Sequence, residues 1–340
     1  MQSKTHWKAE TKKLLKGVDN MNIAFAGFRH GHIFGLYNMV EKNDKVNLIG
    51  CFEENPDAKK AAETNRGIEF NFNSYDEILE NKDVDIIAIG DYYGKRGKMV
   101  IDALKAGKHV ICDKPICTDL TELDEIEKLS EEKNLQVCCM LDLRYLPQTE
   151  KVCQMIKEGV IGEVINVNFT GQHCLDYGNR PAWYYEDGKH GGTINDIAIH
   201  GIDVIRLITG KNLTKVNYAR TWNAYADKEP QFKDCGQFAI EMENMSVMAD
   251  ISYAAPKYNG ILPTYWDFYF WGTKGMIKFN MLDSSIYLYG ANEEKIECEN
   301  REFGYLDALL EEIEGKDTLM NTKGILESQR QVLTIQKAAE

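Results

Sequence analysis

One segment of the chain places ionisable side chains at helical spacing among apolar ones. Residues 191–208 start with two glycines and continue with mostly apolar side chains, interrupted by Asp196, His200 and Asp203. At 3.6 residues per turn, these three side chains fall within about 60° of one another. Burying carboxylates and an imidazole costs several kcal/mol unless they are paired or face a wet cavity. We therefore expect them to face a cleft, with a self-satisfied Asp–His pair in the core as the alternative.

A second candidate is the lysine of Asp113-Lys114-Pro115, which follows the apolar strand 109–112. Ligands of parallel-sheet proteins bind at the carboxyl ends of strands, where an ammonium can polarise a substrate hydroxyl and stabilise a developing alkoxide. Taken alone, a Lys-Pro pair after a strand is more often an ordinary turn. Zinc could use the aspartate and histidine of residues 191–208, but that segment supplies no third ligand, so no metal is expected.

The first strand ends in a turn that is typical of nucleotide binding. Residues 22–27 end at Gly27 just before a helical stretch, and the free amides of a helix N-terminus can bind a pyrophosphate. Arg29 and His32 stand where the full Gly-x-Gly-x-x-Gly pattern has glycine. A plain turn between a strand and a helix is the alternative, and Arg29 could stack on adenine or bind a phosphate.

The second strand ends at Glu53, about where nucleotide-binding folds place the carboxylate that accepts hydrogen bonds from the adenosine ribose. Together with Glu54 it would repel a 2′-phosphate, so NAD is favoured over NADP. The alternative for this carboxylate is a solvated turn before Pro56.

The elements that must position these residues change in character along the chain. Up to about residue 143, apolar strands alternate with helical stretches, which indicates a doubly wound parallel Rossmann sheet of the α/β class. Beyond it the strands cluster, which indicates a second, α+β domain with a mainly antiparallel sheet. We expect an N-terminal extension (1–20), an NAD(P)-binding Rossmann domain (21–143) and a C-terminal substrate and oligomerisation domain (144–340). Helices in the second domain are expected at 147–158, 193–208 and 323–339.

Composition limits the partners. The chain has 340 residues, and 40 Lys and Arg against 53 Asp and Glu give a formal net charge of -13. Such a chain would be repelled by nucleic acid and by anionic membranes, so neither is expected as a partner. The nine cysteines include no Cys-x-x-Cys pair and suggest reduced thiols in the cytoplasm. Residues 1–20 are Lys-rich and are expected to be a dispensable extension, with a packed extra helix as the alternative.

Taken together and in order, these motifs resemble the glucose-fructose oxidoreductase and inositol dehydrogenase family (Gfo/Idh/MocA). The resemblance extends from residue 21 to the C-terminal helix. It rests on the Gly27 turn, residues 106–110 before Asp113-Lys114-Pro115, Trp183, Gly191-Gly192 before Asp196 and His200, and the turn 272–275.

The resemblance implies a Rossmann domain, a second domain whose open sheet makes oligomer contacts, and NAD(P)-dependent chemistry on sugars or polyols. By motif, Lys114, Asp196 and His200 are expected to be catalytic. Asp113 replaces a usual Glu, and Arg96 stands where many members have His. The expected cofactor-binding residues are Gly27, Phe28, Arg29, His30, Glu53, Asp91, Tyr92, Arg96, Asp113, Lys114 and Pro115.

The expected reaction is reversible hydride transfer between nicotinamide C4 and a secondary alcohol carbon. His200 would take the hydroxyl proton, Lys114 would stabilise the alkoxide, and Asp196 would orient the imidazole or hold a neighbouring hydroxyl. The alternatives are a redox-assisted glycosidase that retains NAD, a cofactor-sensing regulator, and a metal-dependent lyase or hydrolase.

Substrate contacts and partners are less strongly indicated. The expected substrate-binding residues are Lys114, Arg144, His173, Trp183, Asp196 and His200. Residues 265–271 have aromatic side chains on both faces of a strand, so one face is expected to meet a second subunit in a homodimer or homotetramer.

Overall fold

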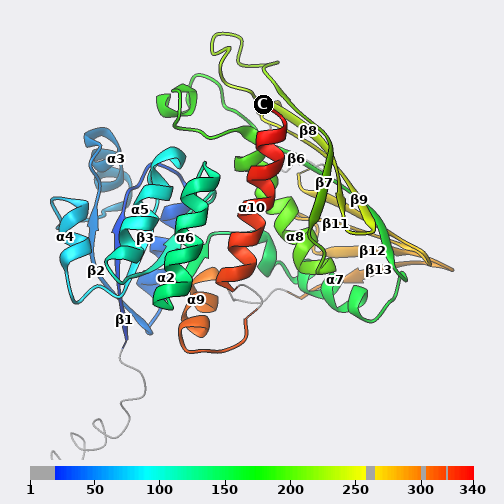
Figure 1. Ribbon diagram of the computed structural model, residues 1–340, viewed down its shortest axis with the longest axis horizontal. Helices are drawn as coiled ribbons and strands as arrows, with labels where there is room; N and C mark the ends of the chain where they lie inside the picture. The colour runs from blue at the N-terminus through cyan, green and yellow to red at the C-terminus, as the bar shows by residue number, and fades with distance from the viewer. Residues whose placement is uncertain (1–19, 258–264, 300–303, 319–320) are drawn as a thin grey trace, which may run out of the picture.

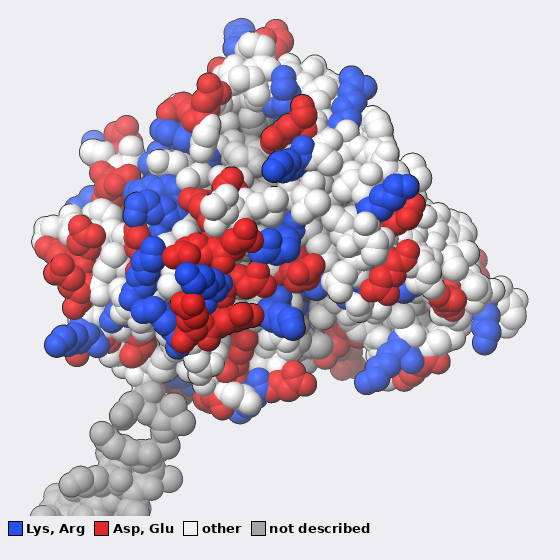
Figure 2. All heavy atoms as spheres, in the orientation of Figure 1, with Lys and Arg blue, Asp and Glu red and all other residues white. Residues whose placement is uncertain are grey.

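The computed structural model describes residues 20–257, 265–299, 304–318 and 321–340. The expected extension at 1–20 therefore lies, apart from residue 20, outside the described residues. Two sheets form the framework, one in each half of the chain, as Figure 1 shows. Among the described residues, no helix combines the length and apolarity needed to cross a membrane. On the face shown in Figure 2, acidic and basic side chains are interspersed.

The first sheet is parallel and has the strand order β2-β1-β3-β4-β5. Its inner strands β3 and β4 are mainly apolar and nearly fully buried, as expected for a sheet covered on both faces. The strands are β1 (Met21–Ala26), β2 (Val46–Phe52), β3 (Ile86–Ile89), β4 (His109–Cys112) and β5 (Val137–Cys139). The helices between them are α2 (His32–Lys42), α3 (Pro56–Arg66), α4 (Tyr75–Glu80), α5 (Tyr93–Lys105) and α6 (Leu120–Lys133).

The second sheet has the order β13-β12-β11-β10-β6-β9-β8-β7, and all its neighbours pair antiparallel except β6 with β9. Alternating burial, clearest in β9, gives it one covered face. Its strands are β6 (Val164–Gln172), β7 (Leu213–Trp222), β8 (Cys235–Met242), β9 (Met245–Ser252), β10 (Asp267–Gly272), β11 (Met276–Asn280), β12 (Ser285–Tyr289) and β13 (Glu293–Glu297). The fold class predicted from the sequence is confirmed.

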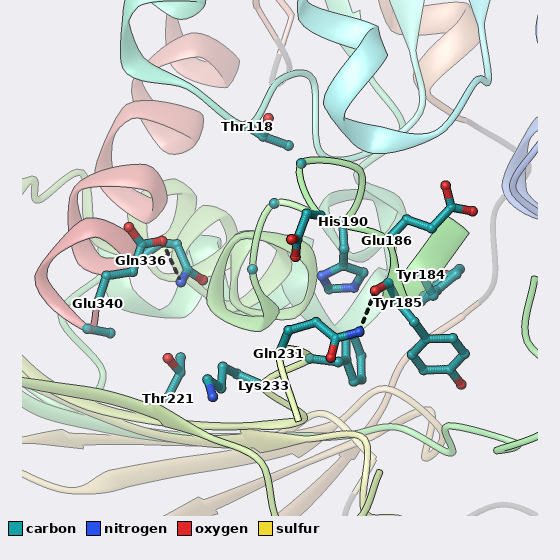
Figure 3. Close-up of a pocket in the computed structure, with 16 residues that line it drawn as sticks. Thr118, Tyr184, Tyr185, Glu186, His190, Thr221, Gln231, Lys233, Gln336 and Glu340 are labelled. Atoms are coloured by element: carbon teal, nitrogen blue, oxygen red, sulfur yellow. Dashed lines mark hydrogen bonds between the residues drawn. The ribbon is translucent and has the colours of Figure 1, made fainter. Parts of the chain in front are cut away.

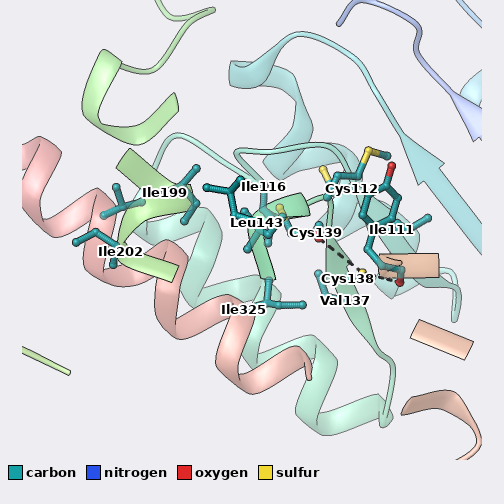
Figure 4. Packing of buried hydrophobic residues seen from close by; sticks show 14 of the residues in the cluster. Ile111, Cys112, Ile116, Val137, Cys138, Cys139, Leu143, Ile199, Ile202 and Ile325 are labelled. Carbon is teal, nitrogen blue, oxygen red and sulfur yellow. Dashed lines mark hydrogen bonds between the residues drawn. The ribbon is translucent and has the colours of Figure 1, made fainter. Parts of the chain in front are cut away.

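Helices of the second half connect the two sheets. The last helix, α10 (Thr322–Ala338), packs against α8 (Ile199–Thr209), and also against α6 and β5 of the Rossmann half, so it lies between the sheets (Figure 1). Figure 4 shows this junction: Ile325 of α10 lies near Val137 of β5, and Ile202 of α8 lies farther along the same cluster, beside Ile199. The remaining helices here are α7 (Pro147–Lys157) and α9 (Tyr305–Ile313), with one-turn helices at Asp142–Tyr145 and Ala182–Tyr185. The division of the chain at residue 143 stays a prediction.

The helix expected at 193–208 is divided in two. A π-helical turn, Ile194–Ala198, precedes α8. Because a π turn advances fewer degrees per residue than an α-helix, the residues on either side of it lose their α-helical alignment. Of the three residues predicted to share one stripe, Asp196 and His200 line the same cavity, whereas Asp203 does not.

Candidate active site

The turn after β1 requires glycine. Gly27 has φ +88°, and a Cβ on it would lie 2.6 Å from the backbone nitrogen of Asp91. Only glycine meets both conditions without strain. The N–H of Arg29 donates to the carbonyl of Gly90 at 2.9 Å, which holds the start of α2 beside the end of β3. The backbone can therefore come close to a ligand at this edge of the sheet.

A cleft of about 1040 Å³ lies at this edge, at the carboxyl ends of the first three strands. Of the predicted cofactor-binding residues, Phe28, Arg29 and Tyr92 line it. The carboxylates of Glu54 and Asp57 line it too. A glycine turn, a helix N-terminus and a wide cleft fit a dinucleotide.

Glu53 does not take the place predicted for it. Its side chain is buried, Oε2 accepts the N–H of Phe28 at 2.5 Å, and Oε1 accepts the N–H of Asn55 at 2.7 Å. Burial raises the pKa of Glu53, and these two hydrogen bonds partly oppose that rise. The carboxylate facing the cleft belongs instead to the next residue, Glu54, whose Oε1 lies 2.6 Å from Lys95 Nζ.

Asp91 and Tyr92, at the start of α5, have different surroundings. Asp91 is buried, and its oxygens accept the N–H of Tyr92 at 2.7 Å and Lys95 Nζ at 2.8 Å. The Tyr92 ring lines the cleft beneath the Arg29 guanidinium, at 5.7 Å. The Asp91 side chain thus stabilises the start of α5, while the Tyr92 side chain is placed to contact a ligand bound in the cleft.

Arg96 is fully buried and lines neither ligand cavity, so its contact with the cofactor stays a prediction. Its Nη1 donates to the carbonyls of Lys114 at 2.5 Å and Pro115 at 3.2 Å. Its Nη2 donates to Asp113 Oδ2 at 2.9 Å and its Nε to the carbonyl of Asp91 at 2.7 Å. The guanidinium therefore fixes the turn that carries Lys114.

The carboxylate of Asp113 lies at the centre of a buried hydrogen-bond network. His30 Nδ1 is 2.7 Å from Oδ2 and His32 Nδ1 is 3.1 Å from Oδ1. Burial opposes ionisation, but the charges of Arg96 and of both histidines hold the pKa of Asp113 well below its usual value. Burial lowers the pKa of His30 to about 4. These three side chains also have the types and spacing of metal ligands. That no metal binds stays a prediction.

Lys114, Asp196 and His200 meet at a second cavity, of about 210 Å³, beyond the Asp113 network. Lys114 Nζ donates to Asp196 Oδ1 at 2.6 Å and to the Asp196 carbonyl at 3.1 Å. The cavity is lined by His30, His32, Tyr93, Lys114, Asp142, Leu143, His173, Arg180, Tyr184, Asp196, His200, Tyr253, Tyr265, Trp266 and Met281.

Asp196 is held from both sides. Its Oδ2 accepts the hydroxyl of Tyr253, and that hydroxyl lies 3.0 Å from His190 Nε2. Burial alone would raise the pKa of Asp196, but the charges of Lys114 and His190 keep it well below its usual value. The Asp196 side chain forms hydrogen bonds with Lys114 and Tyr253 and none with His200. Its predicted role of orienting the His200 imidazole therefore has no contact to support it.

His200 is a neutral imidazole against the cavity. Burial, followed by the charge of Lys114, lowers the pKa of His200 well below 6.5. Its Nδ1 is buried and has no hydrogen-bond partner among the described residues. The ring packs edge-on against Trp266 at 5.5 Å between centroids. An unprotonated imidazole in this position can accept a proton from a hydroxyl.

Arg144 and Asp203 pair with each other instead of facing the cleft. Arg144 Nε and Nη2 donate to the two oxygens of Asp203, each at 2.5 Å. Ser328 Oγ of α10 donates to the same carboxylate at 2.7 Å. Arg144 does not line the substrate cavity, and its contact with a substrate stays a prediction. Asp203 therefore joins α8 to Arg144 and to α10.

Trp183 and His173 lie on different sides of the active site. His173 lines the cavity, and burial lowers its pKa to about 4. Trp183 lines the cofactor-side cleft instead, where its ring contacts Tyr92 and Tyr93 at 6.3 and 4.9 Å. The prediction of a substrate contact therefore agrees with the position of His173 and not with that of Trp183.

Residues 21–141 match the family described as an oxidoreductase family with an NAD-binding Rossmann fold, and residues 149–278 match the GFO/IDH/MocA C-terminal domain. The chain belongs to the GFO/IDH/MocA oxidoreductase family. It carries that family's NAD-binding Rossmann domain.

Relatives of this family agree with the fold. The levoglucosan dehydrogenase of Pseudarthrobacter phenanthrenivorans is 26% identical over 175 residues, 50% of this chain and 44% of that protein. The chain spans about half the length of the curated relatives it matches. A solved putative oxidoreductase from Erwinia carotovora atroseptica has a TM-score of 0.84 at 23% identity, covering 94% of this chain and 99% of its own. A solved levoglucosan dehydrogenase, in complex with NADH and levoglucosan, has a TM-score of 0.78 at 19% identity, covering 94% and 96%.

Within this GFO/IDH/MocA site, several cavity residues were missed by the sequence reasoning. They come from helix starts, one-turn helices and loops in both halves of the chain, so no local motif marks them. Arg180 precedes a one-turn helix, and Tyr253 follows the last residue of β9. The missed residues are His32, Tyr93, Asp142, Leu143, Arg180, Tyr184, Tyr253, Tyr265, Trp266 and Met281.

A third cavity, of about 540 Å³, is lined in part by the glycine pair of the family motif (Figure 3). Gly191 and Gly192 have φ +75° and +94°, and a Cβ on Gly192 would lie 2.2 Å from the Gln336 side chain. Gly192 is therefore required for the close approach of α10, whereas a Cβ on Gly191 would meet Thr118. His190 lines this cavity, as Figure 3 shows, while its Nε2 contacts Tyr253.

Proposed function

We propose that the chain transfers a hydride reversibly between nicotinamide C4 of NAD and a secondary alcohol carbon of a sugar, polyol or related compound. The observation that carries this proposal is the meeting of Lys114, Asp196 and His200 in one cavity beside the cofactor cleft. When bound, the nicotinamide ring supplies the hydride acceptor or donor.

His200 acts as the general base for the substrate hydroxyl. Its ring is neutral at physiological pH because burial lowers the imidazole pKa. Its orphaned Nδ1 marks it as a group with hydrogen-bonding capacity left for a ligand or a water. In the reverse direction the same imidazolium returns the proton to the alkoxide.

Lys114 stabilises the alkoxide that forms as the hydride leaves. The ammonium carries three N–H donors, and two of them are directed at Asp196. The third remains for the substrate oxygen. Asp196 and Tyr253 therefore position Lys114 by fixing the ammonium from the second domain, while Arg96 fixes its backbone from the first.

The cofactor cleft favours NAD, with NADP as the second choice. Glu54 and Asp57 line the cleft after β2, where their charges would repel a 2′-phosphate. Arg29 and Arg66 line the same cleft and would attract one. Comparing the thermal shifts produced by NAD and NADP decides between them, since the tighter ligand raises the melting temperature more.

The substrate is a small molecule. A cavity of about 210 Å³ is below the roughly 300–1,000 Å³ of sites that hold drug-sized ligands, so it accepts about one monosaccharide unit. The faces of Tyr265 and Trp266 suit the C–H surfaces of a sugar ring. The test is absorbance at about 340 nm with NAD and a panel of sugars, polyols and sugar acids. Absence of turnover with the whole panel contradicts the proposal.

The protein also forms a homodimer or homotetramer through the second sheet. Ile165, Met248 and Trp271 are large apolar side chains on strands of this sheet and are 43–55% exposed. Burying them against a second copy would remove that apolar surface from water. Light scattering at micromolar concentration measures the assembly, and a monomer contradicts it.

A further inference from the structure

Arg180 is a cation on the wall of the active-site cavity that forms no ion pair with any described residue. Its Nε and Nη2 donate to the carbonyls of Leu175 and Cys174 at 2.8 and 3.0 Å, and its Nη1 donates to the Tyr184 hydroxyl at 3.2 Å. These bonds fix the side chain. A guanidinium has five N–H donors, so one on Nη1 and one on Nη2 remain for a ligand.

The neighbouring carboxylates have other partners. Asp196 is paired with Lys114, so the two charges cancel inside the cavity. Asp176, near Arg180 in sequence, is exposed and pairs with Lys257 Nζ at 3.0 Å. The charge of Arg180 contributes to the lowered pKa of Asp176, after the contributions of Lys257, but no ion pair joins Arg180 to either carboxylate among the described residues.

Asp142 is the other acidic group on the cavity wall. Burial raises the pKa of Asp142, which weakens its tendency to be charged, and among cationic groups it is most influenced by His32 and then by Lys114. No ion pair joins Asp142 to Arg180 among the described residues. Arg180 instead stacks on the rings of Tyr184 and Tyr253, at 4.9 and 5.9 Å.

The charges near the cavity act on the pKa values of its histidines. Burial is the main cause of the lowered pKa of His173, and the cations Lys114 and Arg180 lower it further. The charges of Lys114 and His32 likewise add to the effect of burial on the pKa of His200. Asp196 opposes these contributions in both histidines, so the contribution of Arg180 shows only that its guanidinium lies near the cavity.

We propose that the substrate carries a carboxylate and that Arg180 binds it, which makes the substrate class a polyhydroxy acid such as an aldonate or uronate. This inference rests on the proposed function, because it concerns the same cavity. The two remaining N–H groups can each donate to one carboxylate oxygen. The anion supplies the counter-charge that Arg180 lacks, while Lys114 and His200 hold the reacting hydroxyl.

The test compares each acid with its amide, which has nearly the same shape and no charge. D-gluconate and D-glucuronate are measured against D-gluconamide and D-glucuronamide, by NADH formation and by calorimetric titration of the NADH-loaded full chain. The variants are Arg180→Gln, which removes the charge, and Arg180→Lys, which keeps it without the planar fork. Arg220→Gln is the matched control, because Arg220 is exposed on β7 and stacks on Trp222 at the same 4.9 Å.

We expect the wild type to prefer acid over amide, and Arg180→Gln to lose about 10- to 100-fold in affinity or kcat/KM for the acid alone. Arg180→Lys should recover part of that loss, and Arg220→Gln should change nothing. Equal use of acid and amide by the wild type overturns the inference. An equal loss with acid and amide in Arg180→Gln overturns it too, because it would mean that Arg180 only stabilises its own loop. Failure of every acid to bind overturns it too. Turnover of neutral sugars in those cases leaves the proposed function standing, whereas no turnover of any panel member contradicts both.

Discussion

Lys114 Nζ lies 2.6 Å from Asp196 Oδ1, and this ion pair joins two residues that are 82 positions apart in the sequence. Lys114 follows a strand of the Rossmann sheet, and Asp196 lies on the π turn before α8. Both groups are almost fully buried, so each depends on the other for its charge. The pair therefore couples the cofactor half of the molecule to the half that carries the proposed base.

Replacing Gly27 by alanine tests the cofactor turn. The added Cβ would collide with the backbone of Asp91, so we expect the dissociation constant for NAD to rise by about 10-fold or more. The matched control is Gly107→Ala, which has a similar φ of +80° but no atom within 4 Å of the added Cβ. That variant should lose about 1 kcal/mol of stability and keep its affinity. Equal affinities in the two variants would contradict the role of the turn.

The buried Arg144–Asp203 pair is predicted to support stability and not substrate binding. Asp203→Asn leaves the Arg144 charge without its carboxylate, so the free energy of unfolding should fall by about 3–5 kcal/mol in urea titrations. The double variant Arg144→Met with Asp203→Leu should recover most of this loss. A higher KM without a loss of stability in Asp203→Asn would instead return Arg144 to the substrate site.

Tyr253→Phe tests how Asp196 is held. The variant removes the hydroxyl that donates to Asp196 and contacts His190, so the Lys114–Asp196 pair becomes less rigid. We expect kcat to fall by about 10-fold, with KM for NAD unchanged. Tyr218→Phe is the control, because Tyr218 is 47% exposed on β7. Wild-type kcat in Tyr253→Phe would show that the hydroxyl is dispensable.

Buried neutral histidines make stability depend on pH. The pKa of His30 is about 4 in the folded protein and about 6.5 in an unfolded chain. Between pH 7 and pH 5 the unfolded chain therefore takes up a proton that the folded protein does not, and the free energy of unfolding falls as pH falls. His30 alone accounts for about 2 kcal/mol at pH 5. In His30→Asn the pH-dependent loss should be smaller by that amount, whereas an unchanged loss would place the His30 pKa near its ordinary value.

Much of the fold and of the site could be predicted, because the signals were local. Continuous apolar strands predict a parallel sheet, and a glycine after the first strand predicts the turn at Gly27. The glycine pair and the spacing of Asp196 and His200 predict a polar edge on an apolar helix. These features depend on residues close in sequence, and sequence periodicity reports on them directly.

The sequence could not show which charges pair across the fold. Arg144 and Asp203 are 59 residues apart, and no local sequence pattern indicates that their charges neutralise each other. Glu53 and Arg96 are charged residues at plausible ligand positions, yet backbone groups occupy their hydrogen-bonding capacity. Arg180 was missed for the opposite reason, since only the folded cavity shows a cation without a carboxylate partner among the described residues.

The central claim is that His200 transfers the proton of the substrate hydroxyl. The most direct measurement compares wild type and His200→Ala in turnover of the best substrate of the panel, beside the dissociation constant for NADH. The account predicts a loss of about 100- to 10,000-fold in kcat with NADH affinity nearly unchanged. Turnover by His200→Ala at the wild-type rate would contradict it.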